Sequence, residues 1–412
     1  MLQDNKITLP WAAWNGDTQL QLQSAANWQV KTYPMVDAVE LEEEEIASAI
    51  ENPIGTAPLA EMVRDKKKIA IAVDDLSRPT PTAHLLEFVL TELDHAGVPS
   101  DAITVIISLG THTALSKEQL YKKMGKDIVD SIRVINHDCR DNLAPVGIQV
   151  GKTDVLLNKD FLDADLRIMI GSVVPHHFAG FSGGAKMVLP GLSNLDSISW
   201  THKAVMMGLR SKPGTVENNR FRAEFERVAR QAGVDFCLNV VVNAKREVAG
   251  LFAGDLIEAH TKAAECAKEI YATEAVENLD VAIFNAYPKD TELLQVENAF
   301  MYMHTVSDNV VRENGTIVVA SACSEGLGEH GLFEPETGVL YRKPMPKRFL
   351  KDRNVIFFVP GVSEEEFYQV YWKGYHFASD WETVVAKINT WHSDGAQVGV
   401  FPHASVQINV AG

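Results

Sequence analysis

The run IAIAV at residues 69–73 is followed directly by the polar stretch DDLSRPTP at residues 74–81. A short apolar run with no polar alternation is typical of a strand that is buried on both faces. Residues 82–96 then have helical periodicity, and two further runs of the same kind occur at residues 103–108 (ITVIIS) and 166–171 (LRIMIG). Buried strands that alternate with helices predict a parallel sheet in an α/β domain.

The same alternation starts again after a long predicted helix at residues 255–275. We therefore expect two α/β domains, residues 1–275 and residues 276–412, each with a mostly parallel sheet flanked by helices. Strands are predicted in the second domain at 280–285, 315–321, 355–360 and 398–402, with a helix at 299–313 and a surface excursion at 333–351. In the first domain we predict a hairpin with strands at 7–13 and 19–23 around Asn15-Gly16, and helices at 41–50 and 116–124.

The composition excludes several classes of protein. The 412 residues hold 38 Lys and Arg against 55 Asp and Glu, a formal net charge of −17, which disfavours binding to a phosphate backbone. No apolar run approaches the roughly 20 residues that cross a bilayer, and the N-terminus has no signal-peptide pattern. Four cysteines without a Cys-x-x-Cys pair suit a reducing compartment. We therefore expect a cytoplasmic protein that binds neither nucleic acid nor a membrane.

Ligands of open α/β sheets bind beyond the carboxyl ends of the strands, so the residues that follow each predicted strand are candidates for a site. Asp75 and Arg78 follow the first strand, His112 follows the second, and the stretch from His176 to Lys186 follows the third. Taken singly, the aspartate and arginine could belong to a helix cap with a salt bridge, and His112 could be a turn histidine. Three strands that deliver acid, guanidinium and imidazole groups to one rim instead indicate a site.

The stretch FSGGAK at residues 181–186 has half of the pattern of a phosphate-binding loop. Met187 follows the lysine, so the Lys-Ser or Lys-Thr pair of NTPases is missing. The glycines still allow the backbone to approach an anion closely. A lysine in such a loop either contacts a phosphate or forms a covalent bond to a carbonyl-type group, and the residues alone leave both open.

A metal hydrolase is another interpretation of this region, because His176, His177 and His202 could supply three zinc ligands. No carboxylate lies at the matching helical spacing, however, and the chain has no His-Glu-x-x-His motif. A Gly-x-Ser-x-Gly nucleophile elbow is also missing. The zinc hydrolase therefore stays an alternative that no motif supports.

Taken together, these motifs resemble those of the lactate racemase family, the nickel-pincer-dependent 2-hydroxyacid racemases and epimerases. The core of the resemblance is His176-x-x-Ala-Gly-Phe-Ser-Gly-Gly-Ala-Lys186-x-x-x-Pro-Gly-x-Ser, with His202 sixteen residues beyond the lysine. Asp75-x-x-Arg78-Pro-x-Pro and Gly110-Thr111-His112 match two further motifs in the expected order. The resemblance extends over most of the chain, from Leu9-Pro10 into the second domain.

The resemblance implies a nickel ion held by a pyridinium-3,5-bisthiocarboxylate mononucleotide, which cofactor-making enzymes must supply. Lys186 would be joined to this group through a thioamide, and His202 would be the nickel ligand of the protein. The stretch Asp75-Leu76-Ser77-Arg78 would contact the cofactor, and Arg78 would also reach the substrate carboxylate. His112 and His176 would be the paired acid and base, in a cleft between the two domains, while the family pattern gives His177 no role.

The chemistry of a 2-hydroxy acid suits these implied roles. Removing the C2 proton is difficult because the carbanion would lie beside a carboxylate, whereas removing hydride gives a stable 2-keto acid. A pyridinium ring can accept the hydride while a histidine accepts the hydroxyl proton. The ketone then turns over and receives the hydride on its other face, so a second histidine is needed.

The sequence departs from the lactate pattern where that pattern binds the substrate. Gln295 matches a substrate-contacting glutamine, but Asn298 stands where the pattern has a lysine, and Thr113 follows His112 where the pattern has an arginine. Losing a cation removes a charge-assisted hydrogen bond, typically worth about 1.5–3 kcal/mol, while an amide can bind hydroxyl groups. We therefore predict a substrate other than lactate, such as an aldonate or another polyhydroxy acid.

Three points stay open at the level of the sequence. The alternatives to a polyhydroxy acid epimerase are a racemase of lactate or another short 2-hydroxy acid, and a cofactor-storage protein without turnover. Trp372 and Tyr375 are candidates for an aromatic residue of the substrate pocket, although such residues more often belong to the core. The oligomeric state is not predicted, and a homo-oligomer is compatible with the sequence.

Overall fold

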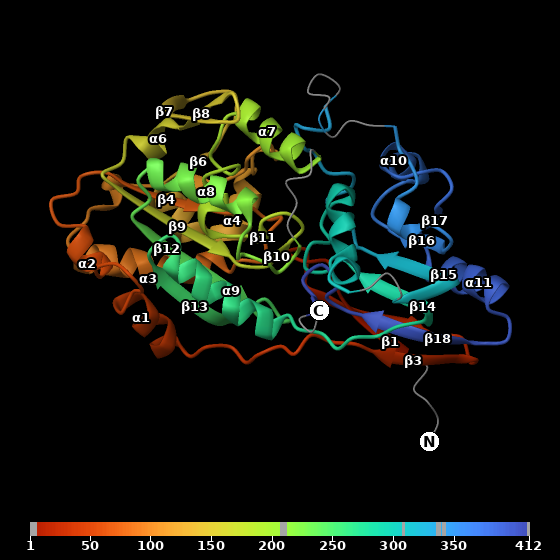
Figure 1. Ribbon diagram of the computed structural model, residues 1–412. Helices are drawn as coiled ribbons and strands as arrows, with labels where there is room; N and C mark the ends of the chain where they lie inside the picture. Colours follow the sequence, from red (N-terminus) through yellow and green to blue (C-terminus); the bar gives the residue numbers. More distant parts are fainter. Residues whose placement is uncertain (1–5, 207–211, 307–309, 335–338, 340–342, 410–412) are drawn as a thin grey trace. The chain divides into compact units, whose positions relative to one another are not determined.

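The chain folds into two compact units, each built on a six-stranded sheet (Figure 1). The computed structural model describes residues 6–206, 212–306, 310–334, 339 and 343–409. The larger unit comprises Ala38–Glu269 and His330–Tyr341, and the smaller unit comprises Met1–Asp37, Ile270–Glu329 and Arg342–Gly412.

The sheet of the larger unit has the strand order β13-β12-β9-β4-β5-β6. All neighbouring strands are parallel except β12 and β13, which form an antiparallel edge pair. The strands are β4 (Ile69–Val73), β5 (Ile103–Ile107), β6 (Arg133–Asn136), β9 (Leu166–Ser172), β12 (Phe236–Val242) and β13 (Val248–Gly254). Two antiparallel hairpins accompany this sheet, β7 (Leu143–Val150) with β8 (Thr153–Asn158) and β10 (Pro175–His176) with β11 (Gly180–Phe181).

The helices of the larger unit supply apolar residues to both faces of its sheet. They are α1 (Glu43–Glu51), α2 (Leu59–Met62), α3 (Thr82–His95), α4 (Lys117–Met124), α5 (Lys126–Ser131), α6 (Lys159–Leu162), α7 (Leu195–Met206), α8 (Arg220–Gln231) and α9 (Glu258–Ile270), with 3-10 turns η1 (Ser100–Ala102) and η2 (Gly184–Met187). Ser116 caps α4 through its side chain, as the sequence predicts.

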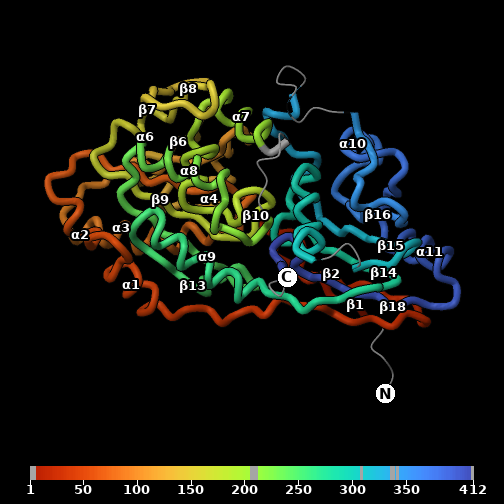
Figure 2. Tube along the Cα trace, in the orientation of Figure 1, coloured from red at the N-terminus to blue at the C-terminus, as the bar shows by residue number. Residues whose placement is uncertain are grey.

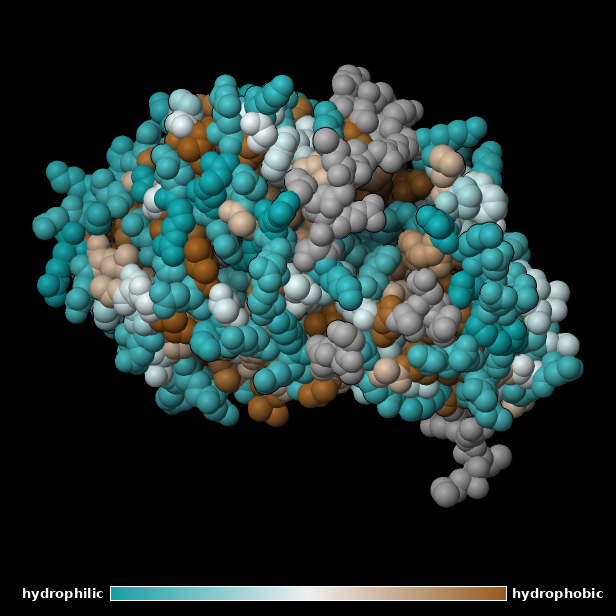
Figure 3. All heavy atoms as spheres, viewed as in Figure 1, coloured by the Kyte–Doolittle hydropathy of each residue, from teal (hydrophilic) through white to brown (hydrophobic). Residues whose placement is uncertain are grey.

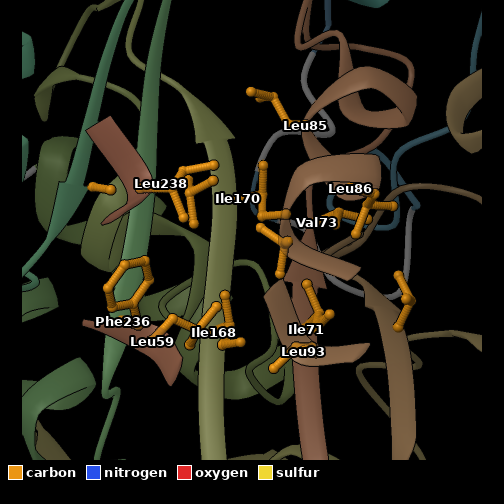
Figure 4. Packing of buried hydrophobic residues seen from close by; sticks show 14 of the residues in the cluster. Leu59, Ile71, Val73, Leu85, Leu86, Leu93, Ile168, Ile170, Phe236 and Leu238 are labelled. Carbon is orange, nitrogen blue, oxygen red and sulfur yellow. The ribbon is translucent and has the colours of Figure 1, made fainter. Parts of the chain in front are cut away.

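The alternation of large and small residues in β4 explains how this strand is buried on both faces. Ile71 and Val73 belong to the core cluster that contains Leu85 and Leu86 of α3, as Figure 4 shows. The residues between them, Ala70 and Ala72, belong to the cluster on the other face, together with residues of η2 and α8. Small side chains on this second face let the loop that contains η2 pack close to the sheet.

The sheet of the smaller unit has the strand order β17-β16-β15-β14-β18-β3, and all its neighbouring strands are parallel. The strands are β3 (Trp28–Thr32), β14 (Leu279–Asn285), β15 (Val311–Ala320), β16 (Asn354–Phe358), β17 (His376–Ala378) and β18 (Ala396–Phe401). The helices are α10 (Glu364–Val370) and α11 (Trp381–Trp391), and the 3-10 turns are η3 (Leu293–Phe300), η4 (Tyr302–His304) and η5 (Arg348–Leu350). The predicted N-terminal hairpin is confirmed as β1 (Lys6–Trp11) paired with β2 (Thr18–Gln23).

The parallel-sheet α/β class is therefore confirmed for both units, but the division of the chain differs from the predicted domains at the N-terminus. Residues 28–32 form β3, which pairs with β18 near the C-terminus, so that red and blue segments lie together in Figure 2. The side-chain amide of Asn285 also donates to the carbonyl of Pro10, at 2.7 Å. Long-range strand pairing thus assigns the first 37 residues to the smaller unit, whose next segment begins at Ile270.

The predicted helix at residues 299–313 is wrong. The 3-10 turns η3 and η4 end at His304, residues 307–309 lie outside the described residues, and β15 already begins at Val311. The buried Val310 and Val311 continue the apolar run of the strand, which the tight turn at Asn314 (φ 59°) interrupts. The predicted surface excursion at 333–351 falls partly outside the described residues, and its Val339 is buried.

The surface in Figure 3 is dominated by hydrophilic residues on the face shown. Among the described residues, no helix has both the length and the apolar character that a membrane span requires.

Candidate active site

Three neighbouring strands of the larger unit, β9, β4 and β5, end at one edge of the sheet and carry the predicted site residues there. Asp75 follows β4, His112 follows β5, and His176 lies in β10 just after β9. Arg78, His112, His176, Lys186 and His202 are all partly exposed, although most residues around them in the chain are buried. The side chains of the rim predicted from the sequence are therefore partly accessible to solvent.

Asp75 and His112 form a hydrogen-bonded pair. The Nδ1 atom of His112 lies 2.5 Å from Oδ2 of Asp75, while the backbone N–H of Ser77 donates to Oδ1 at 2.9 Å. Burial alone would raise the pKa of Asp75, but the imidazole of His112 and the guanidinium of Arg78 hold that pKa well below its usual range. An ionised carboxylate at Nδ1 keeps the proton on that nitrogen, so Nε2 of His112 is left as the basic atom.

An ion pair between Asp74 and Lys123 supports the loop that follows β4. The ammonium of Lys123 is buried and lies 2.8 Å from Oδ1 of Asp74, and it also donates to the backbone carbonyls of Asp75 (3.0 Å) and Thr80 (3.3 Å). The other carboxylate oxygen of Asp74 accepts from the Thr80 hydroxyl at 2.5 Å and from the backbone N–H of Ser172 at 3.2 Å. These contacts tie α4, the loop after β4 and the end of β9 into one support.

Lys186 lies on the 3-10 turn η2, which packs closely against the sheet. A Cβ atom at Gly171 would come within 2.5 Å of the Met187 sulfur, and one at Gly184 (φ +53°) within 2.7 Å of His260. Because glycine has no Cβ atom at these two positions, the turn can approach the sheet and His260 this closely. Burial lowers the pKa of Lys186 to about 7, and the charge of Arg78 acts in the same direction. A substantial fraction of this amine is therefore neutral and nucleophilic near neutral pH.

His202 lies on α7 with a defined orientation. Its Nδ1 atom is 3.0 Å from the backbone carbonyl of Ile198, one helical turn earlier, so Nδ1 carries a proton and Nε2 presents a lone pair. Burial lowers the pKa of His202 to about 4, which keeps the ring neutral. A neutral imidazole with a free Nε2 is the form that binds a metal ion.

The hydrogen bonds of His176 favour the opposite tautomer to that of His112. Its Nδ1 accepts the backbone N–H groups of Phe178 and Ala179, both at 3.2 Å, so in the neutral ring the proton is on Nε2. His112 thus presents a basic nitrogen, whereas His176 presents a donor. His177 is partly exposed, and its ring contacts Phe178.

No group of three His, Cys, Asp or Glu side chains in the described parts of the chain is arranged to hold a metal ion. The described residues include His176, His177 and His202, so their arrangement does not form the zinc site of the alternative interpretation. Since no such group of three occurs among the described residues, we expect a metal ion at His202 to take further ligands from outside the protein.

The sequence analysis missed a histidine of this site, His330. Its ring centroid lies 5.2 Å from that of His112 and 6.0 Å from that of His202. Burial, followed by the charges of His112 and His202, holds the pKa of His330 well below its ordinary value. The chain reaches this position through Gly326 and Gly328, both with positive φ, and this glycine-rich stretch was the available signal.

Two predicted substrate residues of the smaller unit, Gln295 and Asn298, are neighbours on η3. The amide of Asn298 donates to the backbone carbonyl of Gln295 at 2.7 Å and to its Oε1 at 3.1 Å. The preceding loop is anchored by Asp290, whose carboxylate accepts the backbone N–H groups of Ala12 (2.8 Å) and Ala13 (3.1 Å). The 3-10 turn, in which positions i and i+3 eclipse, thereby presents two amide side chains together.

Of the two candidate aromatic residues, Tyr375 is buried in the core of the smaller unit and its hydroxyl accepts the backbone N–H of Lys347 at 2.7 Å. Trp372 is 38% exposed and packs edge-on against Tyr375. Tyr375 therefore has the core role that the sequence analysis considered more common for such residues.

Comparison with known proteins gives one consistent result. The lactate racemase N-terminal domain family matches residues 15–214. Lactate racemase from Thermoanaerobacterium thermosaccharolyticum is 31% identical over 72% of this chain and 69% of its own length, and lactate racemase from Lactiplantibacillus plantarum is 30% identical over 75% and 72%.

Solved structures agree with this result. The apoprotein structure of the Thermoanaerobacterium thermosaccharolyticum lactate racemase has a TM-score of 0.77 at 25% identity, covering 98% of this chain and 100% of that one. A Thermotoga maritima protein shares the fold, with a TM-score of 0.69 at 19% identity, covering 91% of this chain and 99% of that one. These relatives support an isomerase of the racemase type. The chain belongs to the lactate racemase family.

Proposed function

We propose that this protein is a racemase or epimerase that inverts C2 of a 2-hydroxy acid. The observation that carries the proposal is the Asp75–His112 pair, close to Lys186 and His202 at one edge of the sheet. The pair supplies a base of defined tautomer, and the lysine supplies a nucleophilic amine. A protein that only stored a cofactor would need the lysine but not the base.

The residues present fit the cofactor of the family. Lys186, with a pKa near 7, is suited to a covalent amide-type link, and His202 offers one neutral nitrogen. Because the described residues supply no cluster of three metal ligands, the remaining ligands of a nickel ion would come from the pyridinium-3,5-bisthiocarboxylate mononucleotide itself. When bound, this group provides the ring that accepts a hydride from C2 and returns it.

The protein residues around that group would bind the substrate and move its protons. Arg78 would pair with the substrate carboxylate; its guanidinium belongs to the same loop as Asp75 and donates to the backbone carbonyl of Ser77 at 3.1 Å. His112 would accept the C2 hydroxyl proton at Nε2 while Asp75 stabilises the imidazolium. His176, with its proton on Nε2, would donate to the oxygen of the ketone from the other direction.

The substrate class follows from the amide pair of the smaller unit. The amide side chains of Gln295 and Asn298 provide uncharged hydrogen-bond donors and acceptors. Thr113, which follows His112, also carries no charge. An amide can donate to and accept from a hydroxyl group, but it lacks the charge with which a lysine binds a carboxylate. We therefore propose a substrate with additional hydroxyl groups, such as an aldonate, in place of lactate.

Turnover of isotopically defined substrates tests this function. The protein is co-expressed with cofactor-making enzymes, and gluconate and lactate are each supplied as one C2 stereoisomer in deuterium oxide. The proposal predicts inversion at C2 with little deuterium incorporated there, and a higher kcat/KM for gluconate than for lactate. A clear preference for lactate would overturn the substrate class. Inversion of neither acid, with a Lys186 adduct visible by intact-mass analysis, would support storage.

A further inference from the structure

We propose that His330 is a substrate-binding residue that recognises a hydroxyl group next to the reacting carbon. This inference rests on the proposed function and extends it from the C2 hydroxyl to the substituent at C3.

The ring of His330 lies near the two histidines that the proposed function uses. Its centroid is 5.2 Å from that of His112, at an interplanar angle of 59°, and 6.0 Å from that of His202, at 72°, so it is stacked on neither ring. A side chain in this position borders the space where C2 and its substituents must lie.

Residues 330–334 are fixed to the larger unit by several independent contacts. His330 forms an antiparallel β-bridge with His112, and the backbone N–H of Gly331 donates to the carbonyl of Thr111 at 2.9 Å. Leu332 is fully buried in a cluster with Ile198 of α7, the residue whose carbonyl orients His202. The same segment is therefore fixed in position relative to both the loop that carries His112 and the helix that carries His202.

The hydrogen bonds of His330 determine which of its nitrogen atoms faces a ligand as a donor. The backbone N–H of Leu332 donates to Nδ1 at 3.2 Å, which places the proton of the neutral ring on Nε2. The Thr111 hydroxyl oxygen lies 3.4 Å from Nε2, longer than a strong hydrogen bond, and 3.2 Å from Nδ1. Nε2 of His330 thus retains donor capacity for a ligand, and the residue is partly exposed.

Vicinal oxygen atoms of a polyhydroxy acid lie about one hydrogen bond apart, so an imidazole that contacts the base also reaches the neighbouring hydroxyl. When His112 takes the proton of the C2 hydroxyl, Nε2–H of His330 can donate to the oxygen at C3. A neutral donor suits a hydroxyl group, whereas a second carboxylate would need a cation. This geometry points to a substrate that carries a hydroxyl group at C3.

Lactate and glycerate are the matched probes, because they differ only in the C3 hydroxyl. Two variants separate the contributions of the two ring nitrogen atoms. In His330→Gln the side-chain amide can reach the position of Nε2, whereas in His330→Asn it reaches only the position of Nδ1. For the cofactor-bearing protein, we expect His330→Asn to lower kcat/KM for glycerate about tenfold, mainly through KM, with lactate changed less than twofold. His330→Gln should retain most of the preference for glycerate, and the exposed His95→Asn should change neither rate.

An equal loss for both acids, carried by kcat, would overturn the proposal, because it would mean that His330 only positions His112. Calorimetric titration of the cofactor-free forms of the same proteins with glycerate and lactate measures the contact without turnover. His330→Asn must weaken glycerate binding and leave lactate binding unchanged; if both affinities stay the same, the proposal is wrong. Intact mass and inversion of C2 by the unsubstituted protein test the proposed function separately, since His330 does not enter either result.

Discussion

The carboxyl edges of the two sheets occupy equivalent positions in similar topologies, yet they carry opposite chemistry. At the edge of the larger unit stand ionisable groups with strongly shifted pKa values, among them Asp75, Lys186 and His202. At the edge of the smaller unit, η3 presents the uncharged amides of Gln295 and Asn298. In the larger unit buried ion pairs hold reactive groups in place, whereas in the smaller unit a short turn presents exchangeable hydrogen-bonding groups.

Under the proposed function, this difference separates the groups that carry out the chemistry from those that select the substrate. The reactive groups of the larger unit depend on one another, because the pKa of Lys186 depends on Arg78 and Asp75 and the tautomer of His112 depends on Asp75. A change to any of them disturbs the rest. In the smaller unit, the amide of Asn298 donates to the backbone carbonyl and to Oε1 of Gln295, both within η3. A substitution there should therefore alter the choice of substrate before it alters the chemistry.

The largest expected effect comes from replacing Lys186 with alanine. The added mass of the cofactor should disappear from the intact protein, and turnover of every 2-hydroxy acid should fall below detection, because no other described lysine lies on this turn. Lys152→Ala, at an exposed lysine of the same unit, is the control and should keep both the added mass and the activity. An adduct that persists in Lys186→Ala would show that the covalent link involves another residue.

Asp75→Asn should act on the proton-transfer step and leave the cofactor attached. The amide is close to the carboxylate in size but cannot stabilise an imidazolium, so we expect kcat to fall by about 10²–10⁴, the usual contribution of general acid–base catalysis. Intact-mass analysis of the same sample should show full occupancy of Lys186. If kcat stays within a factor of two, His112 does not depend on Asp75 and the proposed base is wrong.

Much of the fold was predictable because its strands are encoded locally. IAIAV was placed correctly as β4, since five consecutive apolar residues between polar stretches suit a strand covered on both faces. The helix at 299–313 failed because its apolar spacing also fits a 3-10 turn followed by a strand. The pairing of β3 with β18 joins residues more than 350 positions apart, which no local pattern encodes.

The site was predictable to the extent that motifs follow strands. The common rim of Asp75 and His112 follows from strand order, and the structure brings the two into contact at 2.5 Å. Lys123 was not predicted, because a lysine on an amphipathic helix is usually exposed and only the tertiary structure buries it against Asp74. His330 was not predicted either, since it reaches the site on a segment that follows β15 in the sequence of the other unit.

Asn298→Lys tests whether the uncharged amide pair of the smaller unit determines the choice of substrate. A cation at this position would bind the carboxylate that lactate and gluconate share, but it would replace the amide proposed to bind the additional hydroxyl groups of gluconate. Losing that neutral hydrogen bond affects gluconate alone, so the ratio of kcat/KM for lactate over gluconate should rise roughly 2- to 10-fold. Asn298→Asp is the matched control, and it should weaken both substrates. If the lysine leaves the ratio unchanged, this position does not determine the substrate and the amide pair loses its proposed role.

The smallest effect concerns the pH dependence of stability, and it arises at Asp290, the anchor of the η3 loop. Burial raises the pKa of Asp290 to about 6, above its ordinary value of about 3.9. The folded state therefore binds this proton more tightly than the unfolded state does. The resulting stabilisation is complete at acidic pH and is lost as the pH rises from about 4 through 6.

Asp290→Asn resembles the protonated form at every pH, so it should remove this dependence. The amide has one acceptor for the two backbone N–H groups of Ala12 and Ala13, which costs about 1 kcal/mol independently of pH. The decisive quantity is consequently the difference in Tm between the variant and the unsubstituted protein, which should shift in favour of the variant between pH 4 and 7. The exposed Asp101→Asn should give a flat difference. A flat difference for Asp290→Asn as well would mean that the anchor is already ionised at pH 4, and that the smaller unit, like the larger one, holds a buried charge at its sheet edge.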